Sequence, residues 1–172
     1  VSSLAVYNGK LYAGLGTDEF ASGQNGDVYV YDGSTWSVSY NGSQGAILGL
    51  AVYNGKLYAG QGTATGAGDV LVYDGSTWDT SYNGGQEEIF GLAVYDGKLY
   101  AGQGNDPGNG DVYVYDGSTW SLNNDVSGID ATHSFGVYNG KLYAGQGIST
   151  GDGDVIVLDA GNQVNSTKIN FS

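Results

Sequence analysis

LAVYNGKLYAG at residues 4–14 and DVYVYDGSTWSVSY at residues 27–40, joined by a Gly-rich loop, form a unit that the chain repeats nearly four times. Corresponding segments begin at Val6, Val52, Val94 and Val137. The repeat steps are therefore 46, 42 and 43 residues. A period of this length, built from short strands and turns, is typical of stacked or ring-forming repeat architectures.

Each repeat predicts two β-hairpins. In the first copy, Leu4–Tyr7 and Lys10–Gly14 flank Asn8-Gly9, and a second hairpin turns at Asp32-Gly33. Both dipeptides tolerate the positive φ angles that a two-residue hairpin turn requires. Similar dipeptides recur at Asn54-Gly55, Asp74-Gly75, Asp96-Gly97, Asp116-Gly117 and Asn139-Gly140. Seven such turns at regular spacing predict a chain made of hairpins.

Four strands per repeat, arranged as an antiparallel meander, predict one blade of a β-propeller. Both faces of the strands are largely apolar, which fits a blade buried between two neighbours. We therefore expect a single all-β domain over residues 1–172, a four-bladed β-propeller with blades at about 1–46, 47–88, 89–131 and 132–172. The alternative is a segment that completes a larger ring by association, because an open stack would expose two blade faces.

Composition and charge exclude several function classes. The 172 residues include 32 Gly and 15 Tyr but no Arg, and the formal net charge is −13. Such a charge repels phosphate backbones and anionic lipid surfaces, so we expect no nucleic-acid partner. No apolar run approaches the roughly 20 residues of a membrane span, so we expect no membrane insertion.

The termini and the absence of cysteine bear on localisation. The chain contains no Cys, which rules out disulfides and thiolate chemistry but does not reveal the redox compartment. It begins without an initiator Met or a signal peptide, like a processed product. An extracellular or cell-surface location is the expectation that follows.

Long variable connections are predicted to lie on one face of the disc, opposite the tight turns, and binding sites tend to lie on such a face. Three repeats place a glutamine in a Gly-Gln-Gly triplet near this face, where amides and aromatic rings together would suit a sugar. The predicted ligand-binding residues are Phe20, Gln24, Tyr40, Gln61, Tyr82, Phe90, Gln103, His133 and Gln146. The alternative is that the glutamines satisfy loop backbone groups.

Acidic loops raise the question of calcium. Asp106, Asp111, Asp152 and Asp154 supply the hard oxygen ligands that calcium prefers, although no complete EF-hand spacing is present. Turn capping by aspartate explains the same recurrence equally well. We therefore expect no obligatory cofactor, with calcium as the one ion that the sequence would suit.

An enzyme is not expected. The tight acidic pairs Asp18-Glu19 and Glu87-Glu88 are sequence neighbours, which seldom face each other across a sugar as a glycosidase requires. His133 is the sole histidine, and no nucleophile elbow accompanies it. We interpret the acidic pairs as solvated surface charge. We interpret His133 as a loop or packing residue.

Asp32-Gly33-Ser34-Thr35-Trp36 and its two copies resemble the Asp-box of sialidase-like and kelch-like secreted β-propellers. Here Asp and Gly are adjacent, so the motif is one residue shorter than the box. The resemblance implies a structural turn between the outer strands, held by hydrogen bonds of Asp and Thr. It does not imply sialidase activity, because those enzymes hold the substrate carboxylate with arginines and this chain has none.

The fourth repeat departs from the others after Leu158, where a longer loop replaces the two-residue turn. One interpretation is an outer strand reached by that loop, and the other is exchange of the strand with an adjacent molecule. The segment concerned is Ser166, Thr167, Lys168, Ile169, Asn170 and Phe171. Three N-x-S/T triplets, at Asn41, Asn165 and Asn170, permit glycosylation outside the cell.

Two functions follow as hypotheses. The first is a non-enzymatic, lectin-like module that binds glycans through the variable loop face. The second is a structural subunit that assembles with other copies into an extracellular fibre or surface layer. The expected partners are accordingly glycans or the chain itself.

Overall fold

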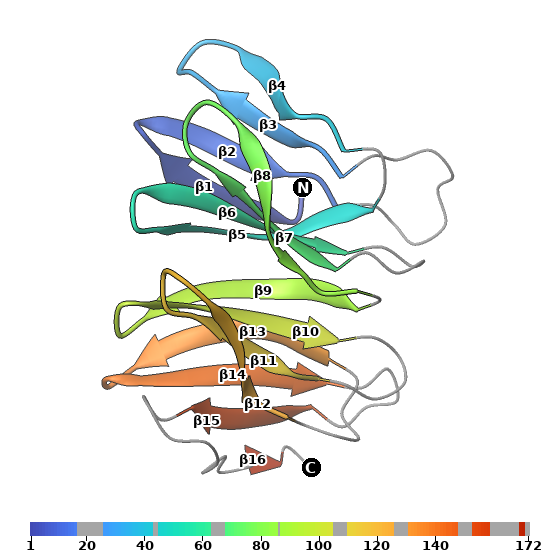
Figure 1. The fold of residues 1–172 in the computed structure, drawn as a ribbon, viewed down its shortest axis with the longest axis vertical. Helices are drawn as coiled ribbons and strands as arrows, with labels where there is room; N and C mark the ends of the chain where they lie inside the picture. The colour runs from blue at the N-terminus through green and yellow to red at the C-terminus, as the bar shows by residue number, and fades with distance from the viewer. Residues whose placement is uncertain are drawn as a thin grey trace. The chain divides into compact units, whose positions relative to one another are not determined.

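The computed structural model of the chain describes residues 1–16, 26–42, 45–62, 68–85, 87–104, 110–125, 131–147, 153–158 and 169–170. Within these residues the regular secondary structure consists of β-strands alone, and every strand pairing is antiparallel. This confirms the all-β prediction. The chain divides into two compact units, Val1–Ile89 and Phe90–Ser172. Figure 1 shows the strands of each unit.

The first unit contains two four-stranded sheets in meander order. The first sheet consists of β1 (Ser3–Tyr7), β2 (Lys10–Gly14), β3 (Val28–Tyr31) and β4 (Trp36–Tyr40). The second sheet consists of β5 (Ala46–Tyr53), β6 (Lys56–Gly62), β7 (Asp69–Tyr73) and β8 (Trp78–Asn83). In both, strand order follows chain order, as the repeat predicts.

The second unit carries the third and fourth repeats, and β9 begins just before it. The third repeat forms β9 (Glu88–Tyr95), β10 (Lys98–Gly104), β11 (Val112–Tyr115) and β12 (Trp120–Asn124). The fourth forms β13 (Ala131–Tyr138), β14 (Lys141–Gly147), β15 (Asp154–Leu158) and β16 (Ile169–Asn170). These strands are joined into one eight-stranded sheet, because β13 pairs with β10 at Gly104 and Ala131. The sequence predicts a separate sheet for each repeat. For repeats three and four this prediction is wrong, because their strands belong to one sheet.

The four Asn-Gly and Asp-Gly turns between the first two strands of each repeat are confirmed. Asn8 and Gly9 both have positive φ, and Tyr7 pairs with Lys10 across the turn. The same left-handed backbone occurs at Asn54, Asp96 and Asn139. A two-residue turn needs positive φ at both positions, and Asn, Asp and Gly reach this region at little cost.

The outer Asp-Gly turns differ from the prediction. Tyr31 pairs with Trp36, so the connection spans four residues, 32–35, and not two. Gly33 has a φ of 104°, but Asp32 is not among the residues with positive φ. The carboxylate of Asp32 instead accepts hydrogen bonds from the turn backbone, which holds the aspartate in an ordinary backbone conformation.

Strand pairing defines two faces for every sheet. In the first sheet, face A carries Leu4, Val6, Leu11, Ala13, Tyr29, Tyr31, Trp36 and Val38. Face B carries Ser3, Ala5, Tyr7, Tyr12, Gly14, Val28, Val30 and Tyr40. The corresponding positions of the other repeats define their faces A and B in the same way.

The core of the first unit lies between face B of the first sheet and face A of the second. It joins Tyr7, Tyr12 and Val28 to Ile47, Leu57, Ala59 and Leu71. Tyr73 brings its ring to 6.1 Å from those of both Tyr7 and Tyr12. In Figure 1, β1 and β2 lie as one layer over β5 and β6.

The second unit repeats this packing with the next two repeats. Tyr100 and Val112, on face B of the third repeat, pack with Leu142, Ala144, Ile156 and Leu158 on face A of the fourth. The same B-on-A contact therefore occurs in both units. Because the repeats are nearly identical, each interface presents similar side chains in similar places.

The strand β16 pairs with β15 of the same chain, with Val155 opposite Ile169. This pairing agrees with the simpler interpretation of the last repeat, an outer strand reached by a longer loop. Val28 pairs with Tyr40 in the first sheet, so Ile169 takes the place of that tyrosine.

Candidate functional site

The three predicted ligand glutamines are buried. Gln61, Gln103 and Gln146 are each less than a tenth exposed, and all three lie at the end of the second strand of their repeat. An amide at such a position is removed from solvent and is not available to a ligand on the surface. Their burial corrects the expectation that they line an exposed loop face.

Gln146 shows what such a glutamine does. Its Nε2 donates to the carbonyl of Gly110 at 3.1 Å and to Oγ1 of Thr132 at 2.9 Å. Thr132 in turn donates its hydroxyl proton to the same Gly110 carbonyl at 2.7 Å. The amide thus links the third repeat to the fourth by satisfying a loop carbonyl, which is the alternative that the sequence left open.

The tyrosines predicted to stack on sugars belong to the sheet packing. Tyr40 lies half-buried with its ring centroid 5.5 Å from that of Trp78 in the next sheet. Burial raises the pKa of its hydroxyl, and the nearby charges of Asp69 and Asp27 raise it further. Tyr82 is also half-buried. Neither ring offers a fully open face.

Phe90 and His133 are two predicted ligand residues that the structure brings together. Their ring centroids are 4.7 Å apart in an edge arrangement at 60°, within the second unit. His133 is exposed and Phe90 is half-buried. The pair therefore presents one aromatic surface beside one polar ring edge.

Two of the four predicted calcium ligands lie within the described residues. Asp154 is buried and Asp111 is half-buried, while Asp106 and Asp152 lie outside the described residues. Among the residues described, no group of three or more His, Cys, Asp or Glu side chains converges. Asp27, at the corresponding position of the first repeat, accepts a hydrogen bond from the amide of Gly42 at 2.9 Å, so this aspartate links the backbone before β3 to the backbone after β4.

Several other predicted residues lie outside the described part of the chain. Of the glycosylation asparagines, Asn41 is exposed, and Asn170 is described by its backbone alone. The remaining predicted residues that lie outside are Phe20, Gln24, Asn165, Ser166, Thr167, Lys168 and Phe171.

The Asp-box-like turns form a compact hydrogen-bond cluster. Oδ1 of Asp32 accepts from the amides of Thr35 at 2.9 Å and Ser34 at 2.8 Å, and Oδ2 accepts from Oγ1 of Thr35 at 3.4 Å. These bonds, the Thr35 amide first, lower the pKa of Asp32 from 3.8 to about 2. The turns at Asp74 and Asp116 repeat the arrangement, with the pKa of each carboxyl also lowered. The turn is structural, as the resemblance implies.

Sequence reasoning did not identify the exposed apolar surface on face A of the first sheet. On face A of the first sheet, Leu4 is 59% and Val6 is 68% exposed. Trp36 and Val38 on the same face are each 48% exposed, and Val1, just before β1, is also exposed. Large contiguous apolar patches on a protein surface mark interaction sites.

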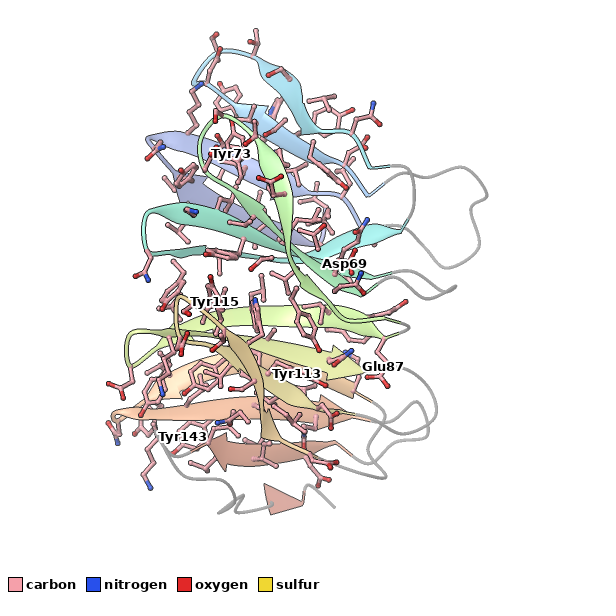
Figure 2. All side chains as sticks on the ribbon, in the orientation of Figure 1. Asp69, Tyr73, Glu87, Tyr113, Tyr115 and Tyr143 are labelled. Carbon is pink, nitrogen blue, oxygen red and sulfur yellow. The ribbon has the colours of Figure 1, made fainter. Side chains whose placement is uncertain are left out.

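Face B of the fourth repeat is a second open face. Along β14 and β15 burial alternates residue by residue, so that Leu142, Ala144 and Ile156 are buried on face A. Tyr143 and Val155, on face B, are half-buried, and Tyr138 is 66% exposed. Alternation of this kind is typical of a sheet that is covered on one side. Figure 2 labels Tyr143 among the side chains of the second unit.

The covered interfaces show how a B face meets an A face. Tyr7 donates its hydroxyl proton to the carbonyl of Gly55 in the next repeat at 3.0 Å, and Tyr95 donates likewise to Gly140. Trp78 donates its indole N–H to Oγ of Ser39 at 3.1 Å. These contacts are a template for what the two open faces would accept.

Comparison with known proteins adds no functional assignment. No protein-family description matches the chain, and no curated protein matches it. Among the described residues there is no helix long and apolar enough to cross a membrane.

Proposed function

We propose that this protein is a non-enzymatic structural repeat protein that associates with other copies of itself through its exposed sheet faces. The observation that carries the proposal is the open apolar face A of the first sheet. Leu4, Val6, Trp36 and Val38 lie on it at 48–68% exposure. Burying side chains of this size contributes about 1.5–3 kcal/mol each, so covering them favours association.

The repeat itself supports this proposal. Repeat proteins bury their cores by stacking one unit on the next, and an uncapped terminal repeat retains a surface that fits another repeat. In this chain face A of the first sheet presents apolar side chains, Leu4, Val6, Trp36 and Val38, rather than the polar outer face that caps a stack of repeats. A fibre or surface layer outside the cell is the setting that we propose for such an assembly.

Sedimentation velocity over a concentration series from about 1 to 500 μM tests this function. We expect the weight-average mass to rise with concentration above the 17.8 kDa of one chain. Electron microscopy of the concentrated sample should show particles larger than one chain. A single species of 17.8 kDa at every concentration would overturn the proposal.

The closed four-bladed ring that the sequence predicts remains a proposal. Four blades are within the range that β-propellers adopt. Closure of one chain and association of several chains compete for the same two faces. The experiments below separate them.

Glycan binding is the second candidate function, favoured by the contact between Phe90 and His133. A half-buried aromatic ring beside an exposed imidazole offers an apolar surface and a hydrogen-bonding edge, which together suit a sugar. The variant Phe90→Leu keeps an apolar side chain but removes the aromatic face. Loss of binding to a glycan array by Phe90→Leu, with retention by Tyr138→Leu, would support this function, and an array that is silent for the native protein would exclude it.

A further inference from the structure

We propose that the chain associates head to tail: face A of the first sheet of one copy packs on face B of the fourth repeat of a second copy. This inference rests on the proposed function and names the surfaces and the geometry of the contact. A heterologous contact of this kind joins different surfaces on the two partners, so it continues into a ring or a filament.

The first argument concerns the space beside a glycine in the second strand of each repeat, which we call the glycine socket. A side chain of the next repeat fills this space in the earlier repeats, and we compare it with the fourth repeat. A Cβ built on Gly14 would lie 2.6 Å from Cγ2 of Ile47, and one built on Gly102 would lie 2.7 Å from Cγ2 of Thr132. In each case the residue that begins the next repeat fills the space beside the glycine. In the fourth repeat the corresponding position is Gly145, and among the described residues its Cβ would meet atoms of Ser134 alone.

The residue that would fill this socket is Val1. It lies five residues before Val6, as Ile47 lies five residues before Val52 and Thr132 five before Val137. Ile47 and Thr132 are fully buried, whereas Val1 is 76% exposed. An isopropyl group matches the branched side chains that lie beside Gly14, Gly60 and Gly102, which are Ile47, Ile89 and Thr132. Val1 of one copy therefore fits beside Gly145 of another.

The second argument is a tyrosine that lacks the cover its counterparts have. Tyr7 donates to Gly55 and Tyr95 donates to Gly140, in both cases across a B-on-A interface. Tyr138 holds the same position in the fourth repeat and is 66% exposed, whereas Tyr7 is 4% exposed. By the same geometry, the Tyr138 hydroxyl donates to the carbonyl of Gly9 in the second copy.

The third argument is the match between the apolar side chains. Inside the first unit, Tyr12, Val28 and Val30 on face B pack with Leu57 and Leu71 on face A. The open faces carry the same or similar residues. On face B of the fourth repeat, the counterparts of Tyr12, Val28 and Val30 are Tyr143, Val155 and Val157. On face A of the first sheet, the counterparts of Leu57 and Leu71 are Leu11 and Tyr29. The second copy therefore offers the packing that an additional repeat would supply.

A second copy is favoured as the occupant because the B-on-A contact propagates. Within the first unit, β1 and β2 form a layer over β5 and β6 (Figure 1). A further copy that packs through the same contact leaves one face A and one face B free. Each end then accepts a further copy through the same set of contacts. Closure of a single chain onto itself is the competing arrangement in the test.

The experiment uses one variant for each face, in the full chain. Leu4→Glu places a charge on face A, and Tyr138→Glu places one on face B; both positions are exposed, so each variant is expected to fold. We expect each variant alone to be monomeric, with self-association weakened at least about 30-fold. An equimolar mixture should form a one-to-one complex with twice the mass of one chain, because each variant keeps one functional face.

Val137→Glu is the matched control, since Val137 neighbours Tyr138 and is 55% exposed but lies on face A of the fourth repeat. It should associate as the native protein does. Tyr138→Phe is a finer variant that removes the hydroxyl alone. It should weaken association about three- to tenfold, as expected for the loss of one hydrogen bond.

The outcomes separate this inference from the function on which it rests. If the native protein stays monomeric and Leu4→Glu leaves the melting temperature unchanged, both the proposed self-association and the head-to-tail contact are overturned. A monomeric protein in which Leu4→Glu and Tyr138→Glu each lower the melting temperature shows closure within one chain and overturns the head-to-tail contact. A native protein that associates, with variants that fail to form the mixed complex, keeps self-association and overturns the head-to-tail geometry.

Discussion

At the scale of single residues, the structure is determined by where the backbone turns and by where two backbones come close. Asn8 and its counterparts adopt positive φ in two-residue hairpins, whereas Asp32 uses its carboxylate to hold a longer turn. Both are Asx-Gly dipeptides, which the sequence alone does not distinguish. They separate because a carboxylate that bonds the amides two and three residues ahead stabilises a different backbone path.

The lowered pKa values of the turn aspartates predict a loss of stability in acid. Asp32 and Asp74 have pKa values of about 2 in the folded protein, against an ordinary value of 3.8. A group with a lowered folded pKa stabilises the protein above the unfolded pKa, and this stabilisation is lost as pH falls from about 4 to 2. In thermal melts, Asp32→Asn should make the decline of melting temperature over this range shallower.

The exposed Asp79→Asn is the matched control for that melt, because Asp79 lies outside the turn clusters. It should leave the acid decline as steep as in the native protein. An equal effect of Asp32→Asn and Asp79→Asn would contradict the assigned role of the turn.

A glycine at a backbone crossing predicts a large effect of one methyl group. A Cβ on Gly68 would lie 1.2 Å from the carbonyl oxygen of Glu87, so Gly68→Ala requires the main chain to move. We expect it to lower the unfolding free energy by about 2–3 kcal/mol. Gly136→Ala is the control: nothing lies within 4 Å of its Cβ, and we expect it to be neutral or to stabilise by about 0.4–1 kcal/mol. Urea denaturation measures both, and similar midpoints for the two variants would contradict the crossing.

At the scale of elements, the two repeats within each unit are joined by the same kind of contact. A glycine on the second strand of one repeat receives the residue that begins the next, and a tyrosine hydroxyl reaches the next tight turn. Small residues let the two sheets approach closely, and the branched side chain fills the remaining space. This contact explains why glycine recurs at this position of the second strand of each repeat, where glycine is otherwise unfavourable.

The Gly14 socket predicts coupling between two residues in different sheets. Gly14→Ala places a methyl group against Cγ2 of Ile47 and should cost about 1–3 kcal/mol, while Ile47→Ala leaves a cavity and should cost about 2–5 kcal/mol. The double variant should cost less than the sum by at least about 0.5 kcal/mol, because the smaller side chain makes room for the methyl group. Denaturant unfolding followed by tryptophan fluorescence measures this cycle. Strict additivity would show that the two residues do not share the space.

At the scale of the whole molecule, charge and apolar surface act in opposite directions on association. Two copies that each carry a net charge of −13 repel each other, while their open faces favour contact. Salt shortens the range of the repulsion and leaves apolar burial intact.

This balance predicts that salt strengthens self-association. Raising sodium chloride from about 20 to 200 mM should lower the dissociation constant about three- to tenfold in sedimentation experiments. The face A variant Leu4→Glu should remain monomeric at both concentrations. A dissociation constant that rises with salt would indicate that ion pairs, rather than apolar faces, hold the copies together.

Much of this architecture follows from sequence because its determinants are local. The Asn-Gly and Asp-Gly dipeptides, the alternating apolar residues and the period of the repeat specify the hairpins and the meander order without reference to distant contacts. The candidate site was harder to predict. Gln146 has the polar side chain of a ligand residue, yet its bonds to Gly110 and Thr132 arise from a neighbouring repeat that the local sequence does not reveal.

The sequence by itself determined that the chain is built of antiparallel hairpins in four related repeats. The tertiary structure alone decided which copies of the same residue are covered. Tyr7 and Tyr138 occupy one position in the repeat, but Tyr7 is buried against the second sheet while Tyr138 is exposed. The physical reason is that burial depends on the neighbour that a face meets, and near-identical repeats cannot record in their own residues which of them has no neighbour.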